Sequence, residues 1–249
     1  MRKEKDFLGE LEIPDDAYYG VQTTRALTNF QITGQVIYPE MIKALACYKW
    51  ATVKANMSTG RMPEDIGNAL CQAAEEIIDG KWHDQFVTDP IQGGAGTSIN
   101  MNANEVLCNR ALEILGYEKG RYDIISPNDH ANMGQSTNDV FPCAIHITAN
   151  FLGKTLIEEF EKTEAAFRAK AEEFRTVIKM GRTHLQDAVP ITLGQEFNAY
   201  ANVCRRCIER LEVSLKKLCA INAGATAVGT GLNADPEYID RCVKFAAEI

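Results

Sequence analysis

The stretch FLGKTLIEEFEKTEAAFRAKAEEFRTVI, residues 151–178, decides the fold that we expect for this chain. One set of its positions recurs at steps of three and four residues: Leu152, Leu156, Phe160, Thr163, Phe167, Ala171, Phe174 and Ile178. That spacing is the period of one face of an α-helix. A helix of about 27 residues reaches roughly 40 Å, which is long for a globular protein.

A second helical pattern follows in FNAYANVCRRCIERLEVSLKKL, residues 197–218. Its apolar positions step close to a heptad: Phe197, Ala201, Cys204, Ile208, Leu211, Leu215 and Leu218. Two long helices around one short break predict an antiparallel pair from a helix bundle. One small monomer cannot cover both faces of such helices, so we expect this part of the chain to assemble with other chains.

Shorter helices are expected upstream, over residues 39–60, 63–79 and 98–115, each closed by a glycine or a nearby turn. The segment up to residue 30 appears as irregular chain in this interpretation, and no convincing strand pair is found. The predicted fold class is mainly α, with an N-terminal helical and loop domain at 1–139 and the first part of a helix bundle at 140–249. The helical spacing still continues at Ile249, so we expect a piece of a longer protein.

Composition narrows the kind of partner. With 34 acidic against 26 basic residues, the net charge of −8 disfavours nucleic acid and anionic membrane surfaces. No run approaching the roughly 20 apolar residues of a membrane span was found, and the N-terminus has no apolar signal region. The eight cysteines are typical of reduced thiols. We therefore expect a cytoplasmic protein that acts on a small molecule.

Three uncharged, donor-rich clusters interrupt the helical patterns. They are GGAGTSINMN at residues 93–102, SPNDHANMGQSTND at 126–139 and GRTHLQDAVP at 181–190. Hydroxyls, amides and backbone N–H groups at helix starts are the groups with which proteins hold small carboxylates. The clusters therefore indicate an enzyme whose substrate is a small polyanion.

Each cluster alone also has a simpler structural interpretation. The first could be a glycine-rich loop with a Thr or Ser N-cap. The second could be a capping run with Asx turns, in which His130 supports the loop rather than taking part in chemistry. In the third, His184 could be satisfied by a nearby carboxylate, and Asp187 could be that partner or a helix cap.

Taken together, the clusters closely resemble the aspartase/fumarase superfamily of class II lyases. The resemblance also includes IPDDAYYGVQTTRALTNF at 13–30 and GATAVGTGLN at 224–233, and it extends over nearly the whole chain. Within the superfamily the match is nearest to the aspartate ammonia-lyases. The first cluster reads GGAGTSINMN where fumarases are closer to GSGTQSNMN, and residues 136–139 read STND where fumarases usually carry SSND.

The resemblance implies a four-carbon dicarboxylate substrate and the reversible elimination of ammonia from L-aspartate to give fumarate. The reaction passes through an aci-carboxylate, which preorganised donors stabilise, and needs no organic cofactor. Thr183 and His184 are the implied catalytic residues, His184 orienting the leaving ammonia rather than acting as base. The implied substrate-binding residues are Thr97, Ser136 and Thr137 at the carboxylate beside C3, Asn138, Thr183 and His184 near the amino group, and Ser98 and Asn100 as supports of the first loop.

The base of this superfamily is a serine in a GSSxMPxKxNP loop, and that string does not occur in residues 1–249. The resemblance therefore implies that this chain is inactive alone. It also implies a homotetramer in which different subunits contribute the three clusters. No metal-ligand set is found, and activation by a divalent cation is left open. The alternatives are fumarate hydratase, with water in place of ammonia, and a non-catalytic helical assembly protein that kept the fold.

Overall fold

The computed structural model describes residues 1–92 and 94–248 as two compact units. The first unit is Met1–Thr148 together with Ile221–Ile249, and the second is Ala149–Ala220. The sequence predicts a domain boundary at 139/140, whereas the structure divides the chain after Thr148. It also assigns the last segment to the first unit, because Tyr238 and Cys242 of that segment are completely buried.

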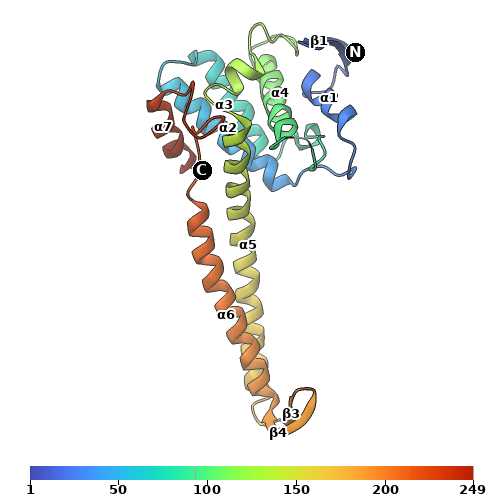
Figure 1. Cartoon of the computed structure of the whole chain (residues 1–249), viewed down its shortest axis with the longest axis vertical. Helices are drawn as coiled ribbons and strands as arrows, with labels where there is room; N and C mark the ends of the chain where they lie inside the picture. The colour runs from blue at the N-terminus through green and yellow to red at the C-terminus, as the bar shows by residue number, and fades with distance from the viewer. Residues whose placement is uncertain (93, 249) are drawn as a thin grey trace. The chain divides into compact units, whose positions relative to one another are not determined.

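The first unit is built mainly from helices, and Figure 1 labels them along the chain. They are α1 (Val21–Asn29), α2 (Pro39–Ser58), α3 (Glu64–Ile78), α4 (Thr97–Ile114) and α7 (Pro236–Ala246), with a 3-10 turn η1 (His83–Gln85) and a π-helical turn η2 (Pro127–Ala131). Helix α2 packs against α3 and α7 and carries much of the buried apolar core. The helices expected at 39–60, 63–79 and 98–115 are confirmed to within two residues at each end.

The N-terminal segment contains two elements that the sequence analysis missed. Strands β1 (Arg2–Asp6) and β2 (Gly9–Ile13) form an antiparallel hairpin with Arg2 opposite Ile13, and α1 follows. The N-cap of α1 is Gly20, which has no side chain that could accept the backbone N–H groups of the first turn. The buried carboxylate of Glu105, on α4, takes the place of this capping side chain. Its carboxylate accepts hydrogen bonds from the backbone N–H groups of Gly20, at 2.8 Å, and Gln22, at 2.7 Å. The segment expected to be irregular is thus fixed to α4.

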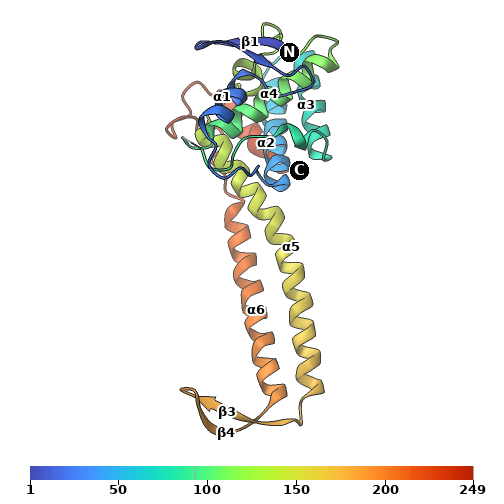
Figure 2. The same ribbon diagram turned by 90° about the vertical axis from the view of Figure 1, so that its right-hand side faces the viewer.

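The second unit is an antiparallel helix pair. Helix α5 (Thr137–Glu173) enters it at Ala149, and α6 (Leu193–Leu218) returns alongside, as both views show (Figures 1 and 2). The rings of Phe174 and Phe197 lie 5.6 Å apart near the connection. Gly194 permits the close approach there, because a Cβ at this position would lie 2.4 Å from the carbonyl oxygen of Ala171. The predicted long antiparallel helices are therefore confirmed.

The connection between α5 and α6 corrects the sequence analysis. Helix α5 ends at Glu173, and Ile178, the last position of the predicted helical pattern, instead begins strand β3 (Ile178–Thr183). Strand β4 (Gln186–Thr192) pairs antiparallel with β3. The third cluster is therefore a β-hairpin, although no strand pair was expected.

One helix in the described part of the chain, α5, is long and apolar enough to cross a membrane by length and composition alone. The sequence predicts no membrane span, because no run approaches about 20 apolar residues. The core helix of a soluble protein passes the same test, so this is weak evidence for a membrane. The absence of a membrane partner stays a prediction.

Candidate active site

The first cluster lies at the start of α4. Its N-cap is Gly96, which has φ 88° and provides no side-chain cap, so the alternative of a Thr or Ser cap is wrong. A Cβ on Gly96 would lie 2.4 Å from the ring of Phe141, so both conformation and space require glycine there. Thr97 is exposed and Ser98 half-buried in the first turn, where the helix dipole favours an anion. Gly93 lies outside the described residues.

The second cluster forms the start of α5. The N–H of Ser136 donates to Asp139 Oδ1 at 2.9 Å, and the N–H of Asn138 donates to Ser136 Oγ at 3.2 Å. The capping interpretation is therefore right for Ser136 and Asp139. Thr137, between them, is half-buried and takes no part in this capping pattern.

The loop at residues 222–227 holds the second cluster from the other side. Asp139 is completely buried, and its Oδ2 accepts from the N–H of Thr226 at 3.1 Å. Burial raises the pKa of the Asp139 carboxyl above its ordinary value. Asn138 donates from Nδ2 to the carbonyl of Ala227 at 2.8 Å, and its Oδ1 has no hydrogen-bond partner among the described residues. A side-chain oxygen of this kind can accept a hydrogen bond from a bound ligand.

A direct contact joins the first two clusters, although 37 residues separate its partners in the sequence. Asn100, which is 1% exposed, donates from Nδ2 to Thr137 Oγ1 at 3.2 Å. The same nitrogen lies 3.1 Å from Asn132 Oδ1. The structure thus brings together the clusters at the starts of α4 and α5, with Asn100 between them.

Lys49 is a buried cation at this junction that the sequence analysis missed. It lies on α2, is 1% exposed, and donates from Nζ to Gln135 Oε1 at 2.8 Å and to Asn132 Oδ1 at 3.0 Å. Burial lowers its pKa to about 7, while the nearby Asp139 carboxylate acts in the opposite direction. The available signal was a lone lysine inside the apolar run LACYKWAT at residues 45–52, because buried lysines are almost always paired.

His130 supports the loop, as the sequence analysis preferred. Its Nδ1 accepts a hydrogen bond from the N–H of Ser126 at 2.9 Å, which closes the turn η2. Because an N–H donates to Nδ1, this nitrogen carries no proton, and burial lowers the pKa of the imidazole in agreement.

The third cluster belongs to the second unit. Thr183 ends β3 opposite Gln186, and the turn between them is His184 with φ 49° and Leu185 with φ 64°. Two-residue hairpins of this kind normally use Asn-Gly, because side chains are strained at positive φ. Such strain is typical of functional sites, and the turn presents His184 and Leu185 as exposed side chains.

Asp187 does not have either role considered for it. Its Oδ1 pairs with Arg182 Nε at 3.1 Å across the hairpin, and Asp187 lies in strand β4. It is therefore neither the partner of His184 nor a helix cap.

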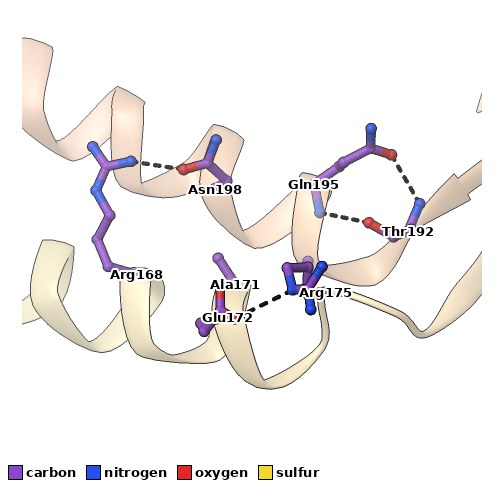
Figure 3. A pocket seen from close by; sticks show the side chains of 8 residues that line it. Arg168, Ala171, Glu172, Arg175, Thr192, Gln195 and Asn198 are labelled. Carbon is purple, nitrogen blue, oxygen red and sulfur yellow. Dashed lines mark hydrogen bonds and ion pairs between the residues drawn. The ribbon is translucent and has the colours of Figure 1, made fainter.

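The groove in Figure 3 lies in the second unit, has a volume of about 360 Å³ and contains no candidate residue. Its polar side chains bond to one another: Arg168 to Asn198 at 2.7 Å, and Arg175 to Glu172 at 3.2 Å. It is a helix junction rather than a second candidate site. Among residues 1–92 and 94–248, no group of three or more His, Cys, Asp or Glu side chains is placed to hold a metal ion.

Long paired helices and hydroxyl-rich helix starts are the main features of this chain, and sequence comparison identifies its family. The model of the Lyase family matches residues 9–249, so the chain belongs to that family. Aspartate ammonia-lyase from Bacillus subtilis is 62% identical over 248 residues, which are 100% of this chain and 52% of that protein. The chain thus spans about half the length of the curated relatives it matches. These comparisons confirm the resemblance drawn from the motifs.

Solved structures agree with the mainly α fold. A fumarate lyase:delta crystallin from Brucella melitensis, bound to cobalt, is 47% identical with a TM-score of 0.96, covering 99% of this chain and 54% of that chain. A class II fumarase from Schistosoma mansoni is 33% identical with a TM-score of 0.92, covering 99% and 52%. The predicted fold class is therefore confirmed.

Replacing the strained turn residue should stabilise the second unit. Leu185→Gly removes a Cβ held at positive φ, and Leu185 is 91% exposed, so few contacts are lost. We expect the variant to be more stable than Leu185→Ala by about 0.5–1 kcal/mol. Thermal unfolding of the 249-residue chain measures this difference. Equal stability of the Gly and Ala variants would show that the turn is unstrained.

The buried Lys49 should make stability depend on pH. The unfolded chain keeps the Lys49 proton up to a pKa near 10.5, whereas the folded chain loses it at about 7. Between these values the folded state binds fewer protons, so this group makes stability rise with pH, by up to about 1.4 kcal/mol per pH unit. Lys49→Met should abolish this contribution.

Denaturant unfolding at pH 7 and pH 9 measures the effect as a difference between the chain and its Lys49→Met variant. The difference is needed because thiols such as Cys108 begin to titrate in this range in the unfolded chain, whereas burial raises their pKa in the folded chain. Identical pH slopes in the two proteins would contradict the burial of a titrating ammonium.

Proposed function

We propose that this chain provides the substrate-binding half of an aspartate ammonia-lyase. The enzyme would eliminate ammonia from L-aspartate reversibly and form fumarate through an aci-carboxylate. The contact between Asn100 and Thr137 carries the proposal, because it joins two uncharged donor clusters at the starts of α4 and α5. The 62% identity to the Bacillus subtilis aspartate ammonia-lyase supports the choice of substrate.

Neutral donors at two helix starts fit the difficult step of this reaction. Removal of the C3 proton places charge on the adjacent carboxylate, which fixed donors can stabilise without reorganisation. The hydroxyls of Thr97, Ser136 and Thr137 would bind this carboxylate. Ser98 and Asn100 would hold the first loop in place.

The amino side of the substrate would use a different set of residues. Asn138 has Oδ1 left for an ammonium, and Thr183 and His184 would complete the set from the β3–β4 hairpin. His184 would orient the leaving ammonia. We propose that the clusters of one site come from different copies of the chain in a homotetramer.

Exposed apolar side chains on the paired helices support this assembly. They occur on both α5 and α6, and four examples are 45–57% exposed: Leu152, Leu156, Val203 and Val213. Burying such surface is a main driving force of association. A cytoplasmic location, the absence of an organic cofactor and the absence of nucleic-acid and membrane partners remain part of the proposal.

Fumarate hydratase is the second candidate. The likeness to the class II fumarase from Schistosoma mansoni favours it, at 33% identity. Two observations favour aspartate instead. Residues 136–139 read STND, the form that resembles aspartases, and the relative at 62% identity is named aspartate ammonia-lyase. Aspartate is therefore the first substrate to test.

Activity should appear only when a serine loop is supplied. The GSSxMPxKxNP motif does not occur in residues 1–249, so we expect no aspartate turnover by this chain alone. A chimera of residues 1–249 with the remaining part of the Bacillus subtilis relative should form fumarate, measured by its ultraviolet absorbance. Sedimentation should show that the chimera is a tetramer.

The other outcomes decide between the alternatives. The added Bacillus subtilis segment alone, which lacks all three clusters of this chain, is the control. A chimera that prefers malate to aspartate would show a hydratase. A folded oligomer that turns over neither substrate would favour the assembly protein. Turnover by the 249-residue chain alone would contradict the need for the serine loop.

Removing one proposed carboxylate donor should slow the chemical step. In the chimera, Ser136→Ala should lower kcat about 10²–10³-fold, the usual effect of losing one oxyanion donor. Ser126→Ala is the matched control, because Ser126 Oγ accepts from Asp129 N–H at 3.1 Å and only caps the turn η2. Equal effects of the two substitutions would remove Ser136 from the site.

A further inference from the structure

Lys49 offers an ammonium group to side chains and backbone of a single loop. Its Nζ donates to Gln135 Oε1 at 2.8 Å, to Asn132 Oδ1 at 3.0 Å and to the carbonyl of Ala131 at 3.4 Å. All three acceptors are uncharged and belong to the second cluster. A buried cation is tolerated only where its donors are satisfied in this way.

The ammonium fixes the orientation of the Asn132 amide. In its protonated form Lys49 can only donate, so Asn132 presents its oxygen to the ammonium. The opposite end of the same amide agrees, because Asn132 Nδ2 donates to the carbonyl of Gln135 at 3.3 Å. Rotating the amide by 180° would place N–H groups against a cation on one side and lose a hydrogen bond on the other.

The orientation of Asn132 in turn fixes two amides of α4. Its Oδ1 also accepts from Asn100 Nδ2 at 3.1 Å and from Asn104 Nδ2 at 3.3 Å. Both residues must therefore present nitrogen, and the oxygens of both are buried without a hydrogen-bond partner among the described residues. Leaving a buried acceptor without a hydrogen bond costs free energy. The orientations of these two amides are therefore determined by Asn132 and not by the surroundings of their own oxygens.

The series of hydrogen bonds that starts at Lys49 ends at Thr137. Asn100 Nδ2 donates to Thr137 Oγ1 at 3.2 Å. The hydroxyl oxygen is thus an acceptor for Asn100, while in the contacts of the described residues its hydrogen has no acceptor. A hydroxyl in this state can give its one hydrogen to a bound carboxylate.

We propose that Lys49 is a positioning residue that sets, through Asn132 and Asn100, the direction in which the Thr137 hydroxyl donates. The inference rests on the proposed function only in requiring that a carboxylate is bound at Thr137. Lys49 does not touch the ligand in this arrangement. The ammonium of Lys49 determines that the Thr137 hydroxyl faces the bound carboxylate as a hydrogen-bond donor.

A purely structural role for Lys49 predicts a different result. If Lys49 only stabilised the loop, its loss would weaken every group of the second cluster equally. If Lys49 acts through the Thr137 hydroxyl, its loss has no further effect once that hydroxyl is removed. A double-mutant cycle between the two positions distinguishes these roles, because contacts that share a path are not additive.

The cycle uses Lys49→Met and Thr137→Val in the chimera, since both replacements keep the approximate shape of the side chain. We expect Lys49→Met to lower kcat/KM for aspartate about ten-fold, equivalent to one lost hydrogen bond. In the Thr137→Val background the same substitution should lower it less than about two-fold. Effects that multiply independently would overturn the proposal.

Two further variants keep the test decisive. Lys54→Met makes the same substitution on the same helix, where Lys54 lies over the Trp50 ring, and should leave activity unchanged. Asn100→Asp replaces the donor to Thr137 with an acceptor, so the hydroxyl would turn inward. Its effect should be smaller in the Thr137→Val background, because the part that acts through the Thr137 hydroxyl is lost there. If Lys49→Met fails to fold, this second cycle decides.

Binding of succinate, measured by calorimetry, separates this inference from the proposed function. Succinate is a non-reacting four-carbon dicarboxylate, and the same cycle can be measured on its dissociation constant. A parent chimera that binds succinate without turning over aspartate would contradict the proposed function, and the binding cycle would still test Lys49. A parent that neither binds succinate nor turns over aspartate would overturn both.

Discussion

A buried ammonium group must have its donors satisfied, and the first unit is arranged around that requirement at Lys49. The acceptors of Lys49 lie in the loop that leads into α5. One of them, Asn132, also accepts hydrogen bonds from the side-chain amides of Asn100 and Asn104 on α4. Three helices that are distant in sequence therefore meet at one polar point inside an apolar core. Because neutral oxygens satisfy the charge, the surrounding hydroxyls are not occupied by ion pairs and can face a ligand.

The long helices could be predicted because each repeats its helical spacing many times, so single irregular positions do not hide the pattern. The two β-hairpins could not be predicted from the sequence. Strand β1 is charged at every position, β2 is short and begins with glycine, and β4 contains Pro190, which normally argues against a strand. The end of α5 was misplaced because Phe174 still fits the helical spacing, although the N–H of Gly194 bonds to its carbonyl and helps to close the turn.

The candidate site shows the same limit at the level of single residues. Composition was sufficient to find the clusters, because Gly, Ser, Thr and Asn are concentrated there. The neighbourhood of Asn100 and Thr137 could not be read from the sequence, since it depends on how α4 packs against the start of α5. A lysine within a helix is normally taken as a solvated residue, so Lys49 was passed over. Asp187 was assigned to a helix or to His184 because the hairpin that pairs it with Arg182 was not foreseen.

The unpartnered amide oxygens of Asn100 and Asn104 have a consequence for attempts to improve this protein. Selection for heat tolerance alone rewards the removal of unsatisfied buried atoms, so apolar replacements at these positions would be among the first to accumulate. Such variants would be stable to heat, but the hydroxyls that face a bound carboxylate would no longer have fixed orientations. A laboratory lineage selected only for robustness would thus drift away from its chemistry at two positions that a ligand does not need to touch.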